Sequence, residues 1–213
     1  DYNWGLDGIY TNFIKLETLD ETTKANYVQK ITTEGAEFVY QWIHSDPDML
    51  YFGENFGGDY LTRDEIKELD IKGSFYNLFD CSASRFTQEN LAKTYLSTQY
   101  GLATIGSTKT GGIYNPETFH NSLAQGKTWG ESYRLWYNNA GVYDDSWFGG
   151  IMIQGDPMLT ISKDTQKQIK NIKPIVYSEK DIKNLKRKFY QNINLNNVKS
   201  FEDYKKENPQ FFK

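Results

Sequence analysis

Cysteine, long apolar runs and an excess of basic charge are scarce or missing in this chain. Cys81 is the only cysteine among 213 residues, which excludes an internal disulfide and any cysteine-based zinc or iron–sulfur site. No apolar stretch approaches the roughly 20 residues that a membrane-spanning helix needs. The formal net charge of −4 gives no electrostatic reason to expect a nucleic-acid partner. We therefore expect neither a membrane span nor bound nucleic acid.

The composition is that of a globular protein. Hydrophobic residues make up 38% and charged residues 24%, which suits one domain with a sizeable core and an appendage. We predict a domain over residues 1–162 and a charged helical tail over 163–213. Acidic residues interrupt the basic ones of this tail, which favours a solvated appendage over a nucleic-acid or membrane patch. Because the chain starts at Asp1 and not at Met, we expect it to be a piece of a longer precursor.

Apolar stretches alternate with helical patterns along the first 162 residues. We predict strands at 37–44, 74–80, 101–106 and 147–153. We predict helices at 21–33, from Thr62 onward, and at 88–97, 116–124 and 129–138, with 45–60 as a loop. This alternation indicates βαβ units, and therefore an α/β fold with a mainly parallel sheet flanked by helices.

Reactive side chains stand at the ends of these predicted strands. His44 ends the first strand, Cys81 follows the second, and the polar loop 107–112 follows the third. Functional loops of a parallel sheet gather at the carboxyl ends of its strands, and a Cys and a His there are the parts of a cysteine-nucleophile site. Taken singly, a lone Cys is most often a small buried hydrophobe. We interpret His120, inside a helical pattern, as structural.

Four stretches share their order and spacing with one family of enzymes. They are Trp42-Ile-His-Ser45, Tyr76-Asn-Leu-Phe-Asp-Cys-Ser82, the run Gly-Leu-Ala-Thr-Ile-Gly-Ser-Thr-Lys-Thr-Gly over 101–111, and Gly155-Asp-Pro-Met-Leu159. His44 precedes Cys81 by 37 residues, which also suits that family. On these motifs, residues 38–161 resemble the catalytic domain of gingipain-type cysteine peptidases, which belong to the caspase-like group with clostripain, legumain and separase.

The resemblance implies a caspase-like three-layer sandwich and a cysteine endopeptidase that forms a thioester acyl-enzyme. Cys81 would be the nucleophile and His44 the general acid, and the backbone N–H groups of Ser45 and Cys81 would bind the oxyanion. We expect the loop residues Ser107, Thr108 and Lys109 to line the cleft for a peptide or protein substrate. The resemblance also implies a secreted or cell-surface protein that requires no cofactor.

The sequence departs from the family in two ways. The family's sheet has two more strands before the His-bearing one, and the acid that orients the histidine belongs to that part. Either a preceding chain of the same precursor supplies this part as a partner, or the protein has a reduced sheet. His44 is followed by Ser45-Asp46-Pro47 where the family more often has Gly-Ser, and Asp46 and Asp48 lie close to the predicted site. These two are candidate Ca²⁺ ligands, or residues that simply favour a turn.

Two other functions are compatible with the strand pattern. The first is a catalytically inactive gingipain-like domain that acts as a structural or binding module. The second is a flavodoxin-like nucleotide-binding domain. No Gly-rich phosphate fingerprint follows the first predicted strand, and the loop 107–112 lacks the spacing of a P-loop. The nucleotide-binding interpretation therefore ranks last.

Overall fold

The computed structural model describes residues 3–53, 58–111, 114–139 and 148–161. The predicted tail over 163–213 lies outside these residues. The strands are β1 (Phe38–Gln41), β2 (His44–Ser45), β3 (Met49–Phe52), β4 (Asp59–Thr62), β5 (Phe75–Leu78), β6 (Ala103–Ser107) and β7 (Ile151–Gly155). The α-helices are α1 (Lys24–Gln29), α2 (Arg63–Glu68), α3 (Leu91–Leu96), α4 (Glu117–Ala124) and α5 (Trp129–Asn139). Short helical turns are η1 (Leu6–Gly8), η2 (Lys30–Glu34) and η4 (Phe148–Gly150). None of the helices in the described part is long and apolar enough to cross a membrane.

The main sheet has four strands in the order β1-β5-β6-β7. β1 pairs with β5 and β5 with β6 in parallel, whereas β7 runs antiparallel to β6. The predicted α/β fold with a mainly parallel sheet is therefore confirmed. The last strand is displaced from its predicted position at 147–153, because residues 148–150 form a 3-10 turn and pairing begins only at Ile151.

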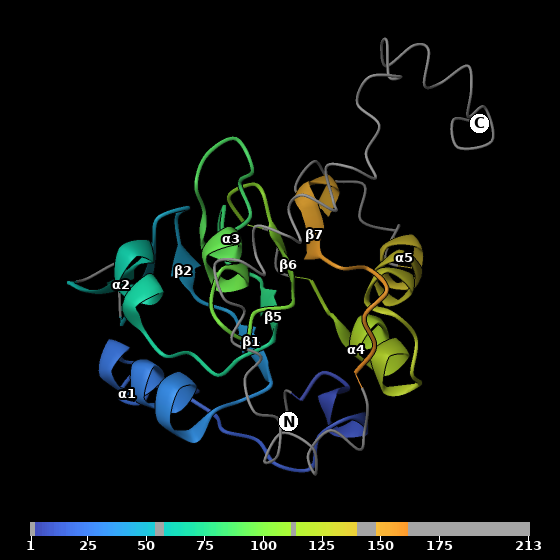
Figure 1. The fold of residues 1–213 in the computed structure, drawn as a ribbon, viewed down its shortest axis with the longest axis horizontal. Coiled ribbons are helices and arrows are strands. Elements are labelled where there is room, and N and C mark those ends of the chain that lie inside the picture. Colours follow the sequence, from blue (N-terminus) through green and yellow to red (C-terminus); the bar gives the residue numbers. More distant parts are fainter. Residues whose placement is uncertain (1–2, 54–57, 112–113, 140–147, 162–213) are drawn as a thin grey trace, which may run out of the picture. The chain divides into compact units, whose positions relative to one another are not determined.

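Both faces of this sheet are covered by helices, which explains why its strands are apolar almost throughout. Alternate residues of β5 and its extension enter different cores. Phe75 and Phe79 join a core with residues of α4 and α5, whereas Tyr76 and Leu78 join a core with residues of α1, α2 and α3. Figure 1 shows α1 and α2 on one side of the sheet and α4 and α5 on the other.

A second sheet, in the order β2-β3-β4, was not predicted, because most of its residues fall within the expected loop 45–60. The Asp and Pro residues that suggested a loop form only the turn of a hairpin. Asp46 Oδ1 accepts the N–H groups of Asp48 and Met49, at 2.7 and 3.1 Å. The alternate residues Leu50 and Phe52 then point into the core, where both are buried. This alternation with a period of two is typical of a strand and could have identified β3 from the sequence.

Helix boundaries follow the local sequence more closely. Thr62 and Glu65 form the predicted capping box at the start of α2, with each side chain accepting the other residue's backbone N–H. Gly35 ends the first helical segment with a φ of 67°. This left-handed conformation costs little for glycine alone.

The Gly155-Asp-Pro157 motif has a steric explanation that a matched pair of substitutions tests. Gly155 has a φ of +100°, and a Cβ there would lie 2.2 Å from the carbonyl oxygen of Leu102, the residue just before β6. Gly126 has a similar φ of +81° with no atom within 4 Å of such a Cβ. We expect Gly126→Ala to cost about 1–2 kcal/mol of unfolding free energy and Gly155→Ala at least about 3 kcal/mol. Urea unfolding measures both, and equal losses would contradict the steric explanation.

Candidate active site

Three loops meet where the parallel strands β1, β5 and β6 end. The loop after β5 runs alongside the loop after β6. Ser82 N–H donates to the carbonyl of Lys109 and Ser84 N–H to that of Ser107, both at 2.9 Å. The segment after β1 contacts the same β5 loop from the other side. The topology thus brings the predicted Cys, His and polar-loop segments together at the carboxyl ends of the parallel strands.

Cys81 lies in a tight turn directly after β5. Ala83 N–H donates to the carbonyl of Asp80 at 3.4 Å, and Ser82 has a φ of +57°. A left-handed conformation costs a non-glycine residue roughly 1–2 kcal/mol, so the surrounding contacts must hold this turn in place. The thiol is half-buried, and its sulfur accepts the N–H of Gly111 at 3.1 Å.

His44 is an exposed residue at the start of β2, and both of its neighbours bind the Cys81 turn. Ile43 N–H donates to Asp80 Oδ1 at 3.1 Å. The Ser45 hydroxyl donates to the carbonyl of Cys81 at 2.6 Å. The backbone that carries His44 is therefore fixed on both sides against the two residues Asp80 and Cys81.

Two backbone N–H groups, those of Ser45 and Cys81, have no backbone acceptor among the described residues. Asp46 N–H bonds to the carbonyl of Met49 at 3.1 Å and closes the hairpin. Ser45 and Leu50 then form a non-hydrogen-bonded pair, so Ser45 directs its N–H away from β3. Cys81 N–H has no hydrogen-bond acceptor among the described residues.

Asp80 was missed by sequence reasoning. It is 1% exposed, and its Oδ2 atom has no hydrogen-bond partner among the described residues. Burial raises the pKa of Asp80 to about 8, although the bond from Ile43 N–H favours the charged form. The signal that could have found Asp80 was an acidic residue at the end of a largely apolar run, beside the only cysteine.

The three predicted cleft residues differ in exposure. Ser107 is fully buried, and its hydroxyl donates to the carbonyl of Lys109 while accepting Lys109 N–H, at 2.8 and 3.1 Å. Thr108 N–H donates to the carbonyl of Gly150 at 2.9 Å. Ser107 therefore shapes the loop, and only Thr108 and Lys109 present side chains at the surface.

The carboxylates proposed as Ca²⁺ ligands have protein partners. Asp46 binds the hairpin turn through Oδ1, and its Oδ2 accepts the hydroxyl of Tyr51 at 2.6 Å. Asp48 pairs with the Arg63 guanidinium at 3.3 Å. Within the residues that the structure describes, no three His, Cys, Asp or Glu side chains cluster as metal ligands.

His120 lies in the core and not at the strand ends. Its Nδ1 donates to the carbonyl of Trp4 at 2.8 Å, and its Nε2 accepts the amide of Asn77 at 3.3 Å. Burial lowers the pKa of His120 to about 4, so the ring is neutral at pH 7. These contacts make it a structural residue.

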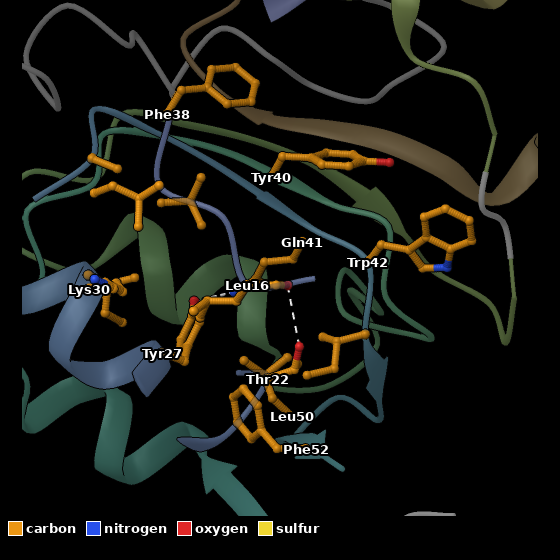
Figure 2. Close-up of a pocket in the computed structure, with 15 residues that line it drawn as sticks. Leu16, Thr22, Tyr27, Lys30, Phe38, Tyr40, Gln41, Trp42, Leu50 and Phe52 are labelled. Carbon is orange, nitrogen blue, oxygen red and sulfur yellow. Dashed lines mark hydrogen bonds between the residues drawn. The ribbon is translucent and has the colours of Figure 1, made fainter. Parts of the chain in front are cut away.

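A separate pocket of about 170 Å³ lies along β1 (Figure 2). Its lining includes Phe38 and Tyr40 from one face of the strand and Val39 and Gln41 from the other, so the pocket lies at the strand's outer edge. Leu16, Tyr27, Leu50 and Phe52 make it largely apolar. Trp42, at its end, is 58% exposed.

The backbone of this outer edge is open. Glu37 and Gln41 direct their carbonyls to the β5 side, where Phe75 and Phe79 donate to them at 2.9 and 3.2 Å. Since backbone groups alternate in direction along a strand, residues 38, 40 and 42 point theirs away from β5. Among the described residues, none forms a backbone hydrogen bond with these groups.

Comparison with known proteins gives a structural likeness. The sequence matches no family model and no curated protein. The chain is similar to the crystal structure of the Arg-specific cysteine proteinase gingipain R, with a TM-score of 0.57 and 16% identity over 76% of this chain. It spans 41% of the length of that chain. Another similar structure is described as a protease, with a TM-score of 0.44 and 13% identity over 76% of this chain and 46% of that one. The domain therefore shares its fold with the matching part of the gingipain R structure.

The buried carboxyl of Asp80 predicts how stability depends on pH. The folded pKa of about 8 exceeds the unfolded value of about 3.9, so the folded state holds a proton that the unfolded state has lost between these values. Stability is then lost as pH rises towards 8, by up to about 1.4 kcal/mol per pH unit. The amide in Asp80→Asn does not ionise. We expect the stability of this variant relative to the wild type to increase from pH 5 to 8 and then level off.

Urea unfolding at several pH values measures this difference, with Asp20→Asn at an exposed position as the matched control. The control should run parallel to the wild type. If the unfolding free energy of Asp80→Asn also ran parallel to that of the wild type across this pH range, Asp80 would be ionised in the folded protein throughout.

Proposed function

We propose that this protein is a cysteine endopeptidase, a thiol-dependent hydrolase in which Cys81 is the nucleophile and His44 the general acid. The observation that carries the proposal is the pair of hydrogen bonds from Ile43 and Ser45 to the Cys81 turn. They hold the segment that carries His44 against the turn that carries Cys81. The caspase-like fold, in which such a pair works at the ends of parallel strands, supports the same assignment.

The chemistry follows from these groups. The thiolate of Cys81 attacks the peptide carbonyl carbon, and the carbonyl electrons move onto oxygen. The N–H groups of Ser45 and Cys81 stabilise this oxyanion. His44 then gives its proton to the amine as the C–N bond breaks, which leaves a thioester. Water attacks the thioester as His44 takes one of its protons, the C–S bond breaks, and the carboxylic acid leaves with the Cys81 thiolate and the protonated His44 restored.

The wider features of the proposal come from the family resemblance. The substrate is a peptide or protein chain that runs past Thr108 and Lys109, and the reaction requires no cofactor. The enzyme acts outside the cell or at its surface. A preceding chain of the same precursor is a partner in this proposal, and it supplies the acid that orients His44.

Covalent labelling tests the proposal. Peptide acyloxymethyl ketones that carry Arg, Lys, Asp or an aromatic residue before the warhead are incubated with the protein, and modified residues are identified by mass spectrometry. We expect one label, on Cys81, with one of the four peptides preferred. His44→Ala should slow the labelling by roughly 10²–10⁴-fold, the usual contribution of a general acid or base. Cys81→Ala should remove it.

Iodoacetamide provides the control, because it reports whether the thiol is accessible without requiring recognition of a peptide. Modification of wild-type Cys81 by iodoacetamide but by none of the ketones would contradict the peptidase proposal. Equal rates for the wild type and His44→Ala would contradict the role of His44.

The open edge of β1 favours a second candidate, a catalytically inactive binding module. Such an edge with an apolar pocket beneath it can pair with an extended peptide that has apolar residues at alternate positions. Hydrogen exchange tests this function on Cys81→Ala with and without peptides of that pattern. Binding at β1 should protect the N–H groups of residues 38, 40 and 42. Protection only in the segments around His44 and Cys81 would instead favour a substrate cleft.

A further inference from the structure

We propose that Asp80 is the positioning residue of this site, and that its carboxyl fixes the segment bearing His44 at the working distance from Cys81. The inference rests on the proposed function of that pair. Its geometry, however, concerns Asp80 itself, a residue for which neither the motifs nor the reaction steps supply a role.

The pairing between β1 and β5 shows why a side chain is needed here. The last backbone bond between the two strands runs from Phe79 N–H to the carbonyl of Gln41, at 3.2 Å. Beyond Gln41 the chain leaves the main sheet, because His44 and Ser45 belong to β2 in the second sheet. The regular ladder therefore cannot continue to the residue that the chemistry requires.

The carboxyl of Asp80 takes the place of the missing ladder. Its Oδ1 accepts Ile43 N–H, the next contact after Gln41 along the chain. The following contact is the Ser45 hydroxyl on the carbonyl of Cys81. His44 lies between these two bonds, and only one of them, that of Asp80, precedes it. Removing the Asp80 carboxyl therefore removes the acceptor of Ile43 N–H, the bond that precedes His44 along the chain.

The surroundings of Asp80 suit a rigid and neutral acceptor. Tyr27 of α1, Tyr40 of β1 and Tyr95 of α3 are the titratable groups whose charge interacts with it. No cation pairs with its carboxyl among the described residues. Because Asp80 is fully buried, closely packed protein atoms surround its side chain and limit its rotamers. A neutral carboxyl can hold Ile43 without placing a second negative charge beside the thiolate.

Substitutions at Asp80 separate positioning from packing. Asp80→Asn keeps an oxygen acceptor of the same size for Ile43 N–H, whereas Asp80→Ala removes it. Asp80→Leu also removes the acceptor but fills the space, which serves if the alanine variant does not fold. We expect Asp80→Asn to be labelled by the preferred peptide ketone close to the wild-type rate. Asp80→Ala and Asp80→Leu should be slowed roughly 10²-fold, the effect of a misplaced catalytic group.

A double-mutant cycle with His44→Ala measures the coupling between Asp80 and His44 in the labelling rate. A purely structural role of Asp80 would not produce such coupling. If Asp80 acts by placing His44, then Asp80→Leu should slow labelling only while His44 is present. Thr104→Ala, which alters a buried polar side chain elsewhere in the sheet, is the matched control for general destabilisation. It should slow neither background.

The outcomes distinguish this inference from the proposed function. If no ketone labels the wild-type protein, the peptidase proposal is contradicted. Iodoacetamide then still shows whether the Cys81 thiol is accessible. A labelled wild type with unaffected Asp80→Leu overturns the role of Asp80. Equal slowing by Asp80→Leu with and without His44 also overturns it, because the effect would then not pass through the imidazole.

Discussion

The hydrogen bonds that leave the ends of β1 and β5 are the constraint on which the site depends. The parallel ladder aligns the two strands, but it ends at Gln41 and Phe79, before either candidate reactive residue. From there the bonds of Ile43 and Ser45 to the Cys81 turn maintain the register. Because one of these uses a carboxyl and the other a hydroxyl, the relative placement of His44 and Cys81 depends on side chains and not on the sheet itself.

Burial on both faces of the sheet sets the electrostatics of the molecule. Asp80 and His120 are both enclosed, and desolvation moves their pKa values in opposite directions, upward for the acid and downward for the base. Each is thereby neutral near pH 7, and each retains a hydrogen bond to backbone at the site it occupies. The two residues nevertheless differ in position. His120 links α4 to the N-terminal segment through Trp4, whereas Asp80 lies at the carboxyl ends of the parallel strands, where the loops meet.

The sequence predicted those features that depend on local pattern. The apolar run over 74–80 indicated a strand covered on both faces, and the capping box at Thr62 located a helix start. The hairpin of β3 and β4 was missed because Asp and Pro dominated the interpretation of a segment whose alternate residues, Leu50 and Phe52, are core. Asp80 could not be assigned, since its partner Ile43 is 37 residues away and contributes only a backbone N–H. The positions of Cys81 and His44 at strand ends could be predicted, but the distance between their side chains depends on contacts that no pattern encodes.

The edge of β1 connects the two candidate functions. Fold alone does not decide between them, and a likeness at 16% identity that spans 41% of the gingipain R chain concerns fold. A strand edge without backbone partners is a liability unless something covers it, and none of the described residues pairs with residues 38, 40 and 42 along this edge. Trp42 at its end stands two residues before His44. A strand paired with β1 would restrain Trp42, and with it the backbone that enters the bond of Ile43 to Asp80. Binding at the edge and the geometry of the reactive pair would then be coupled through one short segment, so an occupied edge would favour catalysis and would not compete with it.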